Sequence, residues 1–191
     1  RMDGLGNRFI IVDRRKNSIN ISKEKIVHLG NLKSLHRNIE FDQIIFIEKE
    51  INNTFPITIF NSDGGEVSAC GNGSRCVAYL LSKDLNNKEI KLKTNNRLLN
   101  AKVMGESDVQ LEMGKPVFEW NKIPLKQKLD HKNIALDIDG KEFTYGFSLN
   151  VGNPHIIFFV KDIDNFDIKK IGPEIENHEI FPERANVTLA K

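Results

Sequence analysis

The strongest constraint on the fold of this chain is a glycine-rich segment that leads directly into an apolar helical pattern. Residues 61–76 hold glycines at positions 64, 65, 71 and 73, which permit tight turns and a close approach of the backbone to other groups. Residues 73–82 then show a helical pattern that is apolar on most sides, through Val77, Ala78, Leu80 and Leu81. We therefore predict a helix that is surrounded by the rest of its domain.

Strand-length apolar segments account for most of the remaining pattern. They are rich in Ile, Val and Phe and cover residues 9–12, 44–47, 57–60, 89–93, 109–112 and 156–160. One further helical pattern covers residues 22–30 and ends at a glycine, a residue type that often caps helices. Many strands and few helices indicate an α+β fold.

A weak internal repeat divides the chain into two parts. Residues 6–12 resemble residues 152–158, because each begins with Gly-Asn, continues through an aromatic ring and runs into a β-branched strand. An amide opens a later strand at a similar spacing in both parts, at Gln43 and at Asn186. Two alternative explanations of this likeness remain open: a duplication, or a coincidence of short apolar motifs.

The domain boundary is predicted at the turn-forming residues 113–116, which include a glycine and a helix-hostile proline. The predicted domains are therefore residues 1–116 and 117–191. The last residues, 186–191, have the pattern of a strand still in progress, so we expect the second domain to be incomplete in these 191 residues.

Composition excludes several classes of function. The net charge of +2 gives no strong field for nucleic acid or an anionic membrane, and neither is expected as a partner. No apolar run approaches the ~20 residues that span a bilayer, so a cytoplasmic protein is expected. The two cysteines are too few for a disulfide scaffold and are expected to be reduced thiols.

Cys70 is the first candidate for chemistry. The glycine-rich turn exposes N–H groups at a helix N-terminus, where a carboxylate or a phosphate binds well. The helix dipole is expected to lower the pKa of the Cys70 thiol at this position, which makes it either a base for a carbon acid or a nucleophile. Cys76, inside the apolar helix, is interpreted as a buried structural thiol. The spacing of the two cysteines does not fit a metal site, and no Walker phosphate loop follows the glycines.

The segment Asn153-Pro154-His155 is the second candidate. The amide of Asn153 can hold a carboxylate or an ammonium group, and the charge of His155 can tune the pKa of a thiol. Taken alone, the same residues are more typical of a turn followed by an ordinary strand side chain.

These segments together resemble the diaminopimelate epimerase family. The Cys-Gly-Asn-Gly-x-Arg-Cys run is the most specific of the matching motifs, which occur in the family's order over nearly the whole chain: residues 2–9, 42–43, 61–76, 113–116, 152–155 and 181–186.

The resemblance implies an epimerase without a cofactor or a metal that interconverts LL- and meso-diaminopimelate, a small-molecule substrate, on the route to lysine and peptidoglycan. It implies two pseudo-symmetric domains, each a curled, mostly antiparallel β-sheet around a central helix, and a homodimer. By the same resemblance Cys70 is one of two catalytic cysteines and His155 tunes them. The substrate-binding positions that it implies are Asn7, Gln43, Asn61, Gly71, Asn72, Asn153 and Asn186.

Two departures from the family pattern stand out. Arg8 occupies a position where the family usually has an acidic residue, and we expect it to lie beside the site. The repeat places the family's second cysteine beyond residue 191, and Cys76 cannot replace it from within the same helix as Cys70.

Three other functions remain open at this stage. One is a related isomerase of the same fold, such as a proline racemase, and another is a catalytically silent binding domain. The third is a cysteine hydrolase with Cys70 as nucleophile and His155 as base, for which the sequence indicates no third residue to orient the histidine.

Overall fold

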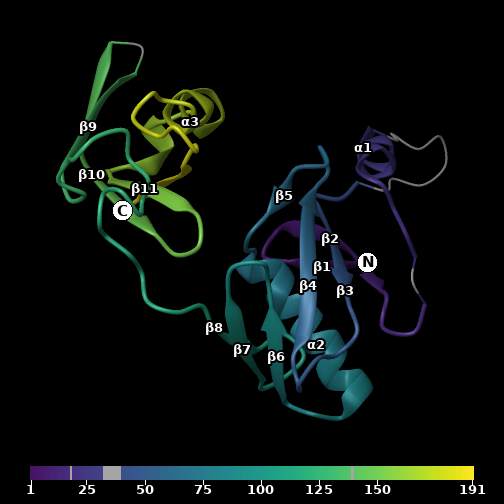
Figure 1. The fold of residues 1–191 in the computed structure, drawn as a ribbon. Coiled ribbons are helices and arrows are strands. Elements are labelled where there is room, and N and C mark those ends of the chain that lie inside the picture. The colour runs from purple at the N-terminus through teal and green to yellow at the C-terminus, as the bar shows by residue number, and fades with distance from the viewer. Residues whose placement is uncertain (18, 32–39, 139) are drawn as a thin grey trace. The chain divides into compact units, whose positions relative to one another are not determined.

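The computed structural model describes residues 1–17, 19–31, 40–138 and 140–191, and these form two compact units. The first unit is Arg1–Met113 and the second is Gly114–Lys191, and each has its own sheet and its own hydrophobic core (Figure 1). Among the described residues, no helix has the length and apolar character needed to cross a membrane.

The first unit is built on one curled eight-stranded sheet. Neighbouring strands are antiparallel, except that β2 is parallel to β3 and β4 is parallel to β6. The order of strands across the sheet is β1 (Met2–Gly4), β2 (Asn7–Asp13), β3 (Gln43–Ile47), β4 (Phe55–Asn61), β6 (Glu89–Lys93), β7 (Leu98–Val103) and β8 (Val109–Glu112), with β5 (Glu66–Val67) paired to β4.

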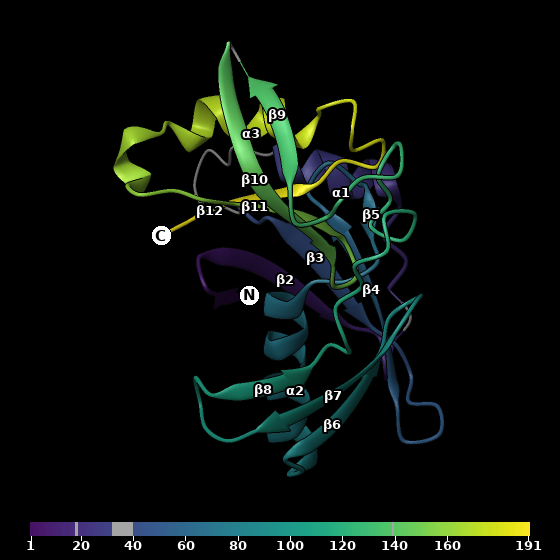
Figure 2. The same ribbon diagram turned by 90° about the vertical axis from the view of Figure 1, so that its left-hand side faces the viewer.

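The helix α2 (Gly71–Leu85) lies inside the curve of this sheet (Figure 2). It contacts the two end strands, β1 and β8, as well as strands between them. Val77, Ala78 and Leu81 of α2 are completely buried, in the same core cluster as Phe9 of β2. The prediction of a surrounded helix is confirmed, and the helix is longer than the predicted residues 73–82.

A smaller helix, α1 (Lys23–Asn31), covers the opposite face of the sheet. Its Ile26 packs with Ile44 and Phe46 of β3, whereas Ile45 and Ile47 of the same strand belong to the core around α2. Successive strand residues point to opposite faces, so β3 is apolar throughout because both of its faces are covered.

The second unit has a four-stranded sheet in the order β12 (Asn186–Ala190), β11 (Pro154–Phe159), β10 (Lys141–Asn150) and β9 (Ile134–Ile138). The helix α3 (Ile168–Glu176) follows a short 3₁₀ turn, Ile163–Asn165, and contacts β12 and β9. Its Ile175 is buried with Ile156 and Phe158 of β11. The expected α+β architecture is thus observed.

Each unit contains a strand–helix–strand motif, and the two parallel strands pair in the same register in both motifs. In the first unit β2 and β3 are parallel, with Phe9 beside Gln43, and α1 lies between them in the chain. In the second unit β11 and β12 are parallel, with His155 beside Asn186, and α3 lies between them. These registers pair the positions that the sequence repeat aligns, so α3 is the counterpart of α1 and not of α2.

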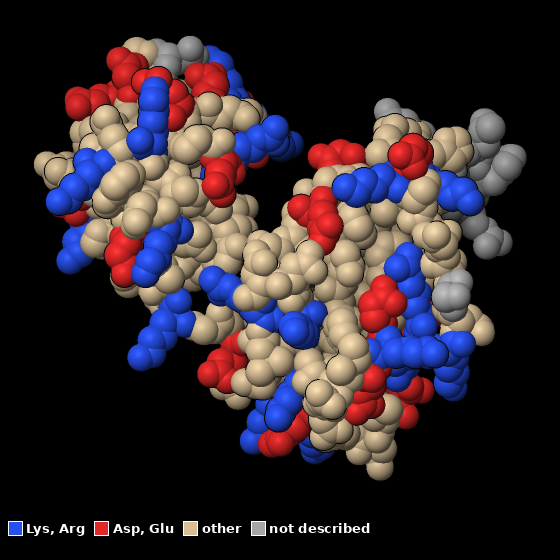
Figure 3. Space-filling model, viewed as in Figure 1, with Lys and Arg blue, Asp and Glu red and all other residues tan. Residues whose placement is uncertain are grey.

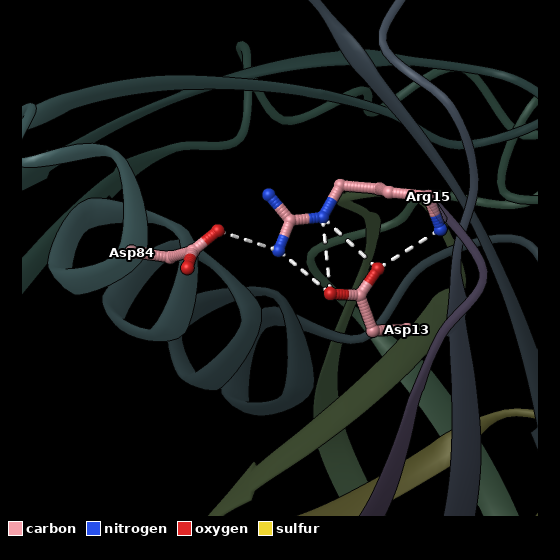
Figure 4. A network of polar contacts seen from close by, with 3 residues as sticks. All are labelled: Asp13, Arg15 and Asp84. Atoms are coloured by element: carbon pink, nitrogen blue, oxygen red, sulfur yellow. Dashed lines mark hydrogen bonds and ion pairs between the residues drawn. The ribbon is translucent and has the colours of Figure 1, made fainter. Parts of the chain in front are cut away.

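Arg15 connects the end of β2 with the last turn of α2 by hydrogen bonds and ion pairs (Figure 4). Arg15 donates from Nε and Nη2 to the carboxylate of Asp13, and its Nη2 also lies 2.8 Å from Oδ2 of Asp84. A carboxylate near a helix C-terminus is unfavourable, and the guanidinium compensates the charge of Asp84 there. On the face shown in Figure 3, basic and acidic side chains are interspersed, in keeping with the net charge of +2.

Candidate active site

Cys70 is the residue that caps the N-terminus of α2. Its backbone is extended, and its Sγ accepts a hydrogen bond from the backbone N–H of Gly73 at 3.3 Å. The first N–H groups of a helix have no carbonyl partner within the helix, so they are available to hold negative charge. The thiol therefore lies where a thiolate, or an anionic group beside it, is stabilised.

The pKa of the Cys70 thiol differs from the expectation. Burial raises the pKa above its usual range, against the lowering effects of the N–H groups of Gly73 and Asn72 and the charge of Arg75. The expected lowering by the helix terminus is thus present but is outweighed, because a buried thiolate loses its hydration. A thiolate formed here is a stronger base than one with a low pKa.

The glycines on either side of Asn72 lie close to neighbouring side chains. A Cβ atom on Gly73 would lie 2.5 Å from Cδ1 of Ile45 and 3.2 Å from a ring carbon of Phe9. A Cβ atom on Gly71 would lie 3.1 Å from the sulfur of Met113. At Gly73 the first turn of α2 thus packs closely against Ile45 and Phe9 of the sheet, whereas a side chain at Gly71 would displace the flexible end of Met113.

Asn72 and Asn7 meet at the N-terminus of α2. The Nδ2 group of Asn72 donates to Oδ1 of Asn7 at 3.0 Å, which joins the helix to the first residue of β2. Arg75, one turn further along the helix, donates from Nη2 to Oδ1 of Asn72 at 2.7 Å. The two asparagines and the arginine thus form one continuous chain of hydrogen bonds.

Gln43 and Asn61 form a second amide pair in the first unit. They lie opposite each other in the antiparallel pairing of β3 and β4, and Nε2 of Gln43 donates to Oδ1 of Asn61 at 3.0 Å. The Oε1 atom of Gln43 is buried and has no hydrogen-bond partner within the described part of the chain. A buried acceptor without a partner is costly, so this oxygen is available to a ligand donor such as an ammonium group.

The remaining candidates, Asn153, His155 and Asn186, are grouped in the second unit. Nε2 of His155 lies 3.0 Å from Oδ1 of Asn153, and Nδ2 of Asn186 donates to the carbonyl oxygen of Pro154. Burial lowers the pKa of His155, so the ring is mainly neutral at pH 7. A residue that orients His155 is thus present in Asn153, whereas the sequence had indicated none.

The structure of the first unit shows where Cys76 and Arg8, two further residues discussed from the sequence, lie. Cys76 is buried, with 7% of its surface exposed, and its Sγ faces the backbone oxygen of Asp3 at 3.9 Å, as expected of a structural thiol. Arg8 follows Asn7 on β2 and so points to the opposite face of the strand, where it pairs with Glu40. Its side chain therefore lies away from the Asn7–Asn72 contact.

Two residues with a part in this geometry were not singled out from the sequence. Arg75 orients the Asn72 amide, and only its place inside the Cys-Gly-Asn-Gly-x-Arg-Cys run was a signal. Asp42 accepts the backbone N–H of Arg8 at 2.7 Å through Oδ2, and its own carbonyl oxygen accepts the N–H of Ser62. It thereby holds three segments together just before Gln43.

The first unit therefore combines a partly buried thiol, a helix N-terminus and two amide pairs. A thiolate that is held by N–H donors can remove a proton or attack an electrophile, while neutral amides hold a polar ligand without fixed charge. Among residues 1–17, 19–31, 40–138 and 140–191, no three His, Cys, Asp or Glu side chains are grouped as ligands for a metal ion.

Comparison with known proteins gives a consistent result. The family model described as "Diaminopimelate epimerase" matches residues 1–119. A protein of that name from Pelagibacter ubique is 46% identical over all of this chain and 69% of its own length. One from Rhizobium etli is 39% identical over all of this chain and 64% of its own length. The chain thus spans about two thirds of the length of these relatives.

Solved structures with low sequence identity share the fold. A predicted epimerase from Pseudomonas aeruginosa matches with a TM-score of 0.56 at 14% identity, over 96% of this chain and 64% of that one. A hydroxyproline epimerase from Agrobacterium vitis matches with a TM-score of 0.53 at 14% identity, over 91% of this chain and 52% of that one. With the family model matching more than half of the sequence and a relative 46% identical across all of it, this chain belongs to the diaminopimelate epimerase family.

Proposed function

We propose that this chain is part of an isomerase that interconverts LL- and meso-diaminopimelate without a cofactor, in lysine and peptidoglycan biosynthesis. The observation that carries the proposal is Cys70 at the N-terminus of α2, where its Sγ accepts the N–H of Gly73. Family membership supports the reaction, and the thiol supplies the base that such a reaction needs when no pyridoxal phosphate is present.

In the proposed step the Cys70 thiolate removes the α-proton of the substrate. The bond between the α-carbon and hydrogen breaks, a bond between sulfur and hydrogen forms, and the electron pair moves toward the α-carboxylate. Negative charge grows on the carboxylate oxygens, and the backbone N–H groups of Gly71 and Asn72 are suited to stabilise it because they begin a helix. Burial of the thiol strengthens the base once the thiolate has formed.

The amide groups are proposed to bind the rest of the substrate. Asn7 and Asn72 form one pair and Gln43 and Asn61 the other, and together they offer both donors and acceptors to a zwitterionic amino acid centre. The buried, unpartnered Oε1 of Gln43 supports a donor on the ligand at that point. Asn153 and Asn186 of the second unit are proposed to add further amides.

Inversion requires a second acid on the opposite face of the α-carbon. Cys76 does not suit this role, because it is buried against the backbone of Asp3 and lies on the same helix as Cys70. We propose that the acid is a second cysteine from outside these 191 residues. His155 is proposed to adjust the thiols from the second unit, and its pKa, lowered by burial, makes it a neutral partner near pH 7.

The same family relationship supports proposals about the setting of the enzyme. Both cysteines of the chain are free thiols, which suits a reducing cytoplasm. A homodimer is proposed on family resemblance, and nucleic acid is not expected as a partner because the net charge is only +2. Sedimentation of the complete gene product distinguishes a dimer from a monomer.

The reaction is tested by exchange of the substrate α-proton in deuterated water. The complete gene product should incorporate deuterium into LL-diaminopimelate, and Cys70→Ala should abolish that incorporation, with Cys76→Ala as the matched control on the same helix. Unchanged exchange in Cys70→Ala, or no exchange by the unmodified protein, would contradict the proposal.

The same preparation distinguishes the other candidate functions. The contact between Asn153 and His155 supplies the orienting group that a cysteine hydrolase needs, so an acyl group trapped on Cys70 after treatment with an ester would favour that activity. Tight binding of diaminopimelate without any exchange would favour a silent binding domain. Exchange with proline in preference to diaminopimelate would favour a proline racemase.

A further inference from the structure

Arg75 is used by none of the steps above, although it contacts the proposed binding site. Its Nη2 donates to Oδ1 of Asn72 at 2.7 Å, and Nδ2 of Asn72 donates to Oδ1 of Asn7 at 3.0 Å. The three side chains are partly buried at the start of α2 and of β2. Two hydrogen bonds in series therefore connect Arg75, through Asn72, with Asn7 of β2, which lies 65 positions before Asn72 in the chain.

Donors and acceptors can follow each other in only one order along this series of hydrogen bonds. A guanidinium group has five N–H donors and no acceptor, so it can bind only the oxygen end of the Asn72 amide. With its oxygen turned to Arg75, Asn72 must present its NH₂ group to Asn7. That donor in turn holds the oxygen of Asn7, which leaves the NH₂ group of Asn7 for a ligand.

Without the arginine, the amide of Asn72 has no such constraint. The oxygen and nitrogen ends of an asparagine side chain are nearly the same in size and shape, so rotation by 180° has little steric cost. Two asparagines in contact can then exchange donor and acceptor roles together. A site that must bind the carboxylate of an amino acid would present an acceptor oxygen to it part of the time, with a loss of affinity.

The local charges show that Arg75 makes this contact in preference to an ion pair. Asp3 and Glu106 line the same cavity of about 300 Å³ as Arg75 and Asn72. Glu106 accepts a hydrogen bond from the hydroxyl of Tyr79, and Asp3 lies 4.0 Å from Arg1. In the described part of the chain, Arg75 is in no ion pair with either carboxylate and donates instead to the neutral amide.

We propose that Arg75 is a positioning residue that fixes the orientation of the Asn72 and Asn7 amides, so that the site presents N–H donors to a carboxylate of the substrate. This inference rests on the proposed function, because it assigns the ligand of these amides. Arg75 itself does not contact the reacting atoms. It acts through Asn72, and its effect belongs to substrate binding more than to proton transfer.

A second effect of Arg75 must be separated from this one. Its positive charge lowers the pKa of both Cys70 and Cys76, so removal of the charge alters the thiol as well as the amides. Arg75→Lys keeps the charge but replaces the planar group that reaches Asn72 with a compact ammonium. Arg75→Met removes both the charge and the donors.

The experiment measures KM, kcat and the pKa of Cys70 in the complete gene product. We expect Arg75→Lys to raise KM for LL-diaminopimelate about tenfold with a smaller change in kcat, the split expected for lost binding. The pKa of Cys70, from the pH dependence of its alkylation, should stay near the wild-type value in Arg75→Lys and rise in Arg75→Met. Lys83→Met, at the other end of α2, is the control for loss of a positive charge and should leave KM unchanged.

A second measurement does not depend on the reaction. The side-chain NH₂ signals of Asn7 and Asn72 in ¹⁵N spectra should be single and protected from exchange in the wild type, and doubled or broadened in Arg75→Met. Unaltered signals together with an unaltered KM in both Arg75 variants would overturn the inference. If the wild type shows no α-proton exchange but Arg75→Met disturbs the amide signals, the proposed function fails while the positioning role of Arg75 stands.

Discussion

The Sγ atom of Cys70 accepts a hydrogen bond from the backbone N–H of Gly73 at 3.3 Å. The thiol thereby replaces the hydroxyl or carboxylate oxygen that usually caps a helix N-terminus. Two opposing influences meet on this sulfur, because the helix N–H groups favour the thiolate while burial disfavours it. The balance favours the thiol, so the residue is a latent base whose activity depends on pH.

The first prediction concerns the pH dependence of Cys70. Alkylation by iodoacetamide, followed by mass spectrometry of the Cys70 peptide, should rise with pH through a midpoint above that of an ordinary cysteine, because burial raises the pKa. Since the folded-state pKa is raised, its contribution to stability is present below the unfolded pKa and is lost as pH rises through the folded pKa. A midpoint below that of free cysteine would contradict the structure.

The second prediction concerns the close packing of Gly73. Gly73→Ala should lower the free energy of unfolding by about 1–3 kcal/mol, because the added Cβ would lie 2.5 Å from the buried Cδ1 of Ile45. Gly105→Ala is the matched control, since its added Cβ would lie at an ordinary 3.9 Å from Cβ of Asp108. That variant should change the free energy of unfolding by less than about 0.5 kcal/mol.

Urea denaturation followed by circular dichroism measures both effects. Both glycines lie in the first unit, so both variants are compared with the same transition of the wild type. Equal stability of Gly73→Ala and the wild type would show that α2 can move away from β3 without cost.

The third prediction concerns the Asp13–Arg15–Asp84 network (Figure 4). Arg15→Met should destabilise the first unit by about 1–2 kcal/mol, because the arginine side chain is only 17% exposed and serves two carboxylates. Lys122→Met removes an exposed ion pair with Glu119 and should cost less than about 0.5 kcal/mol. Thermal unfolding at low and high salt compares the two, and equal losses would assign no special role to the network.

The fourth prediction concerns His155. Its pKa is lowered by burial, so the folded state favours the neutral ring. The stability that this contributes is present above the unfolded pKa of about 6.5 and is lost as pH falls through the folded pKa. His155→Gln should therefore flatten the decline in unfolding free energy between pH 7.5 and pH 5. An NMR titration that places the pKa of His155 above 6.5 would contradict the burial of its ring.

Much of the first unit was predictable because its hydrophobic pattern is local. β6 and β8 have the predicted bounds, and β6 alternates regularly, with Ile90 and Leu92 buried between exposed neighbours. β3 was predictable for the opposite reason, since both of its faces are covered and its residues are apolar throughout.

Other elements were missed because their patterns are interrupted. β10 has a register shift between Phe143 and Gly146, and Tyr145 has a φ of +58°, so no regular alternation runs along the strand. α3 contains Pro173 after Gly172, two residues that argue against a helix. The cap that Asp167 makes at its start and its packing against β9 and β12 stabilise it.

The sequence predicted the position of Cys70 in the candidate site, but not the pKa of its thiol or the orientation of the neighbouring amide. Glycines before an apolar helix placed Cys70 at the helix start, as observed. The prediction that the pKa of Cys70 is lowered was wrong. Burial raises this pKa, and burial depends on the surrounding sheet, so the local sequence carries no signal of it. The orientation of Asn72 by Arg75 likewise depends on which end of an amide faces a guanidinium, which sequence does not encode.

The shared register of the two parallel strand pairs has a chemical consequence. The position beside Gln43 is Phe9, a completely buried hydrocarbon ring, whereas the position beside Asn186 is His155, a ring that can gain a proton. One scaffold thus occurs twice with an inert ring in one copy and an ionisable ring in the other. Any response to acid at this position belongs to the second copy alone, so two strand pairs with the same register differ in their chemistry at this position.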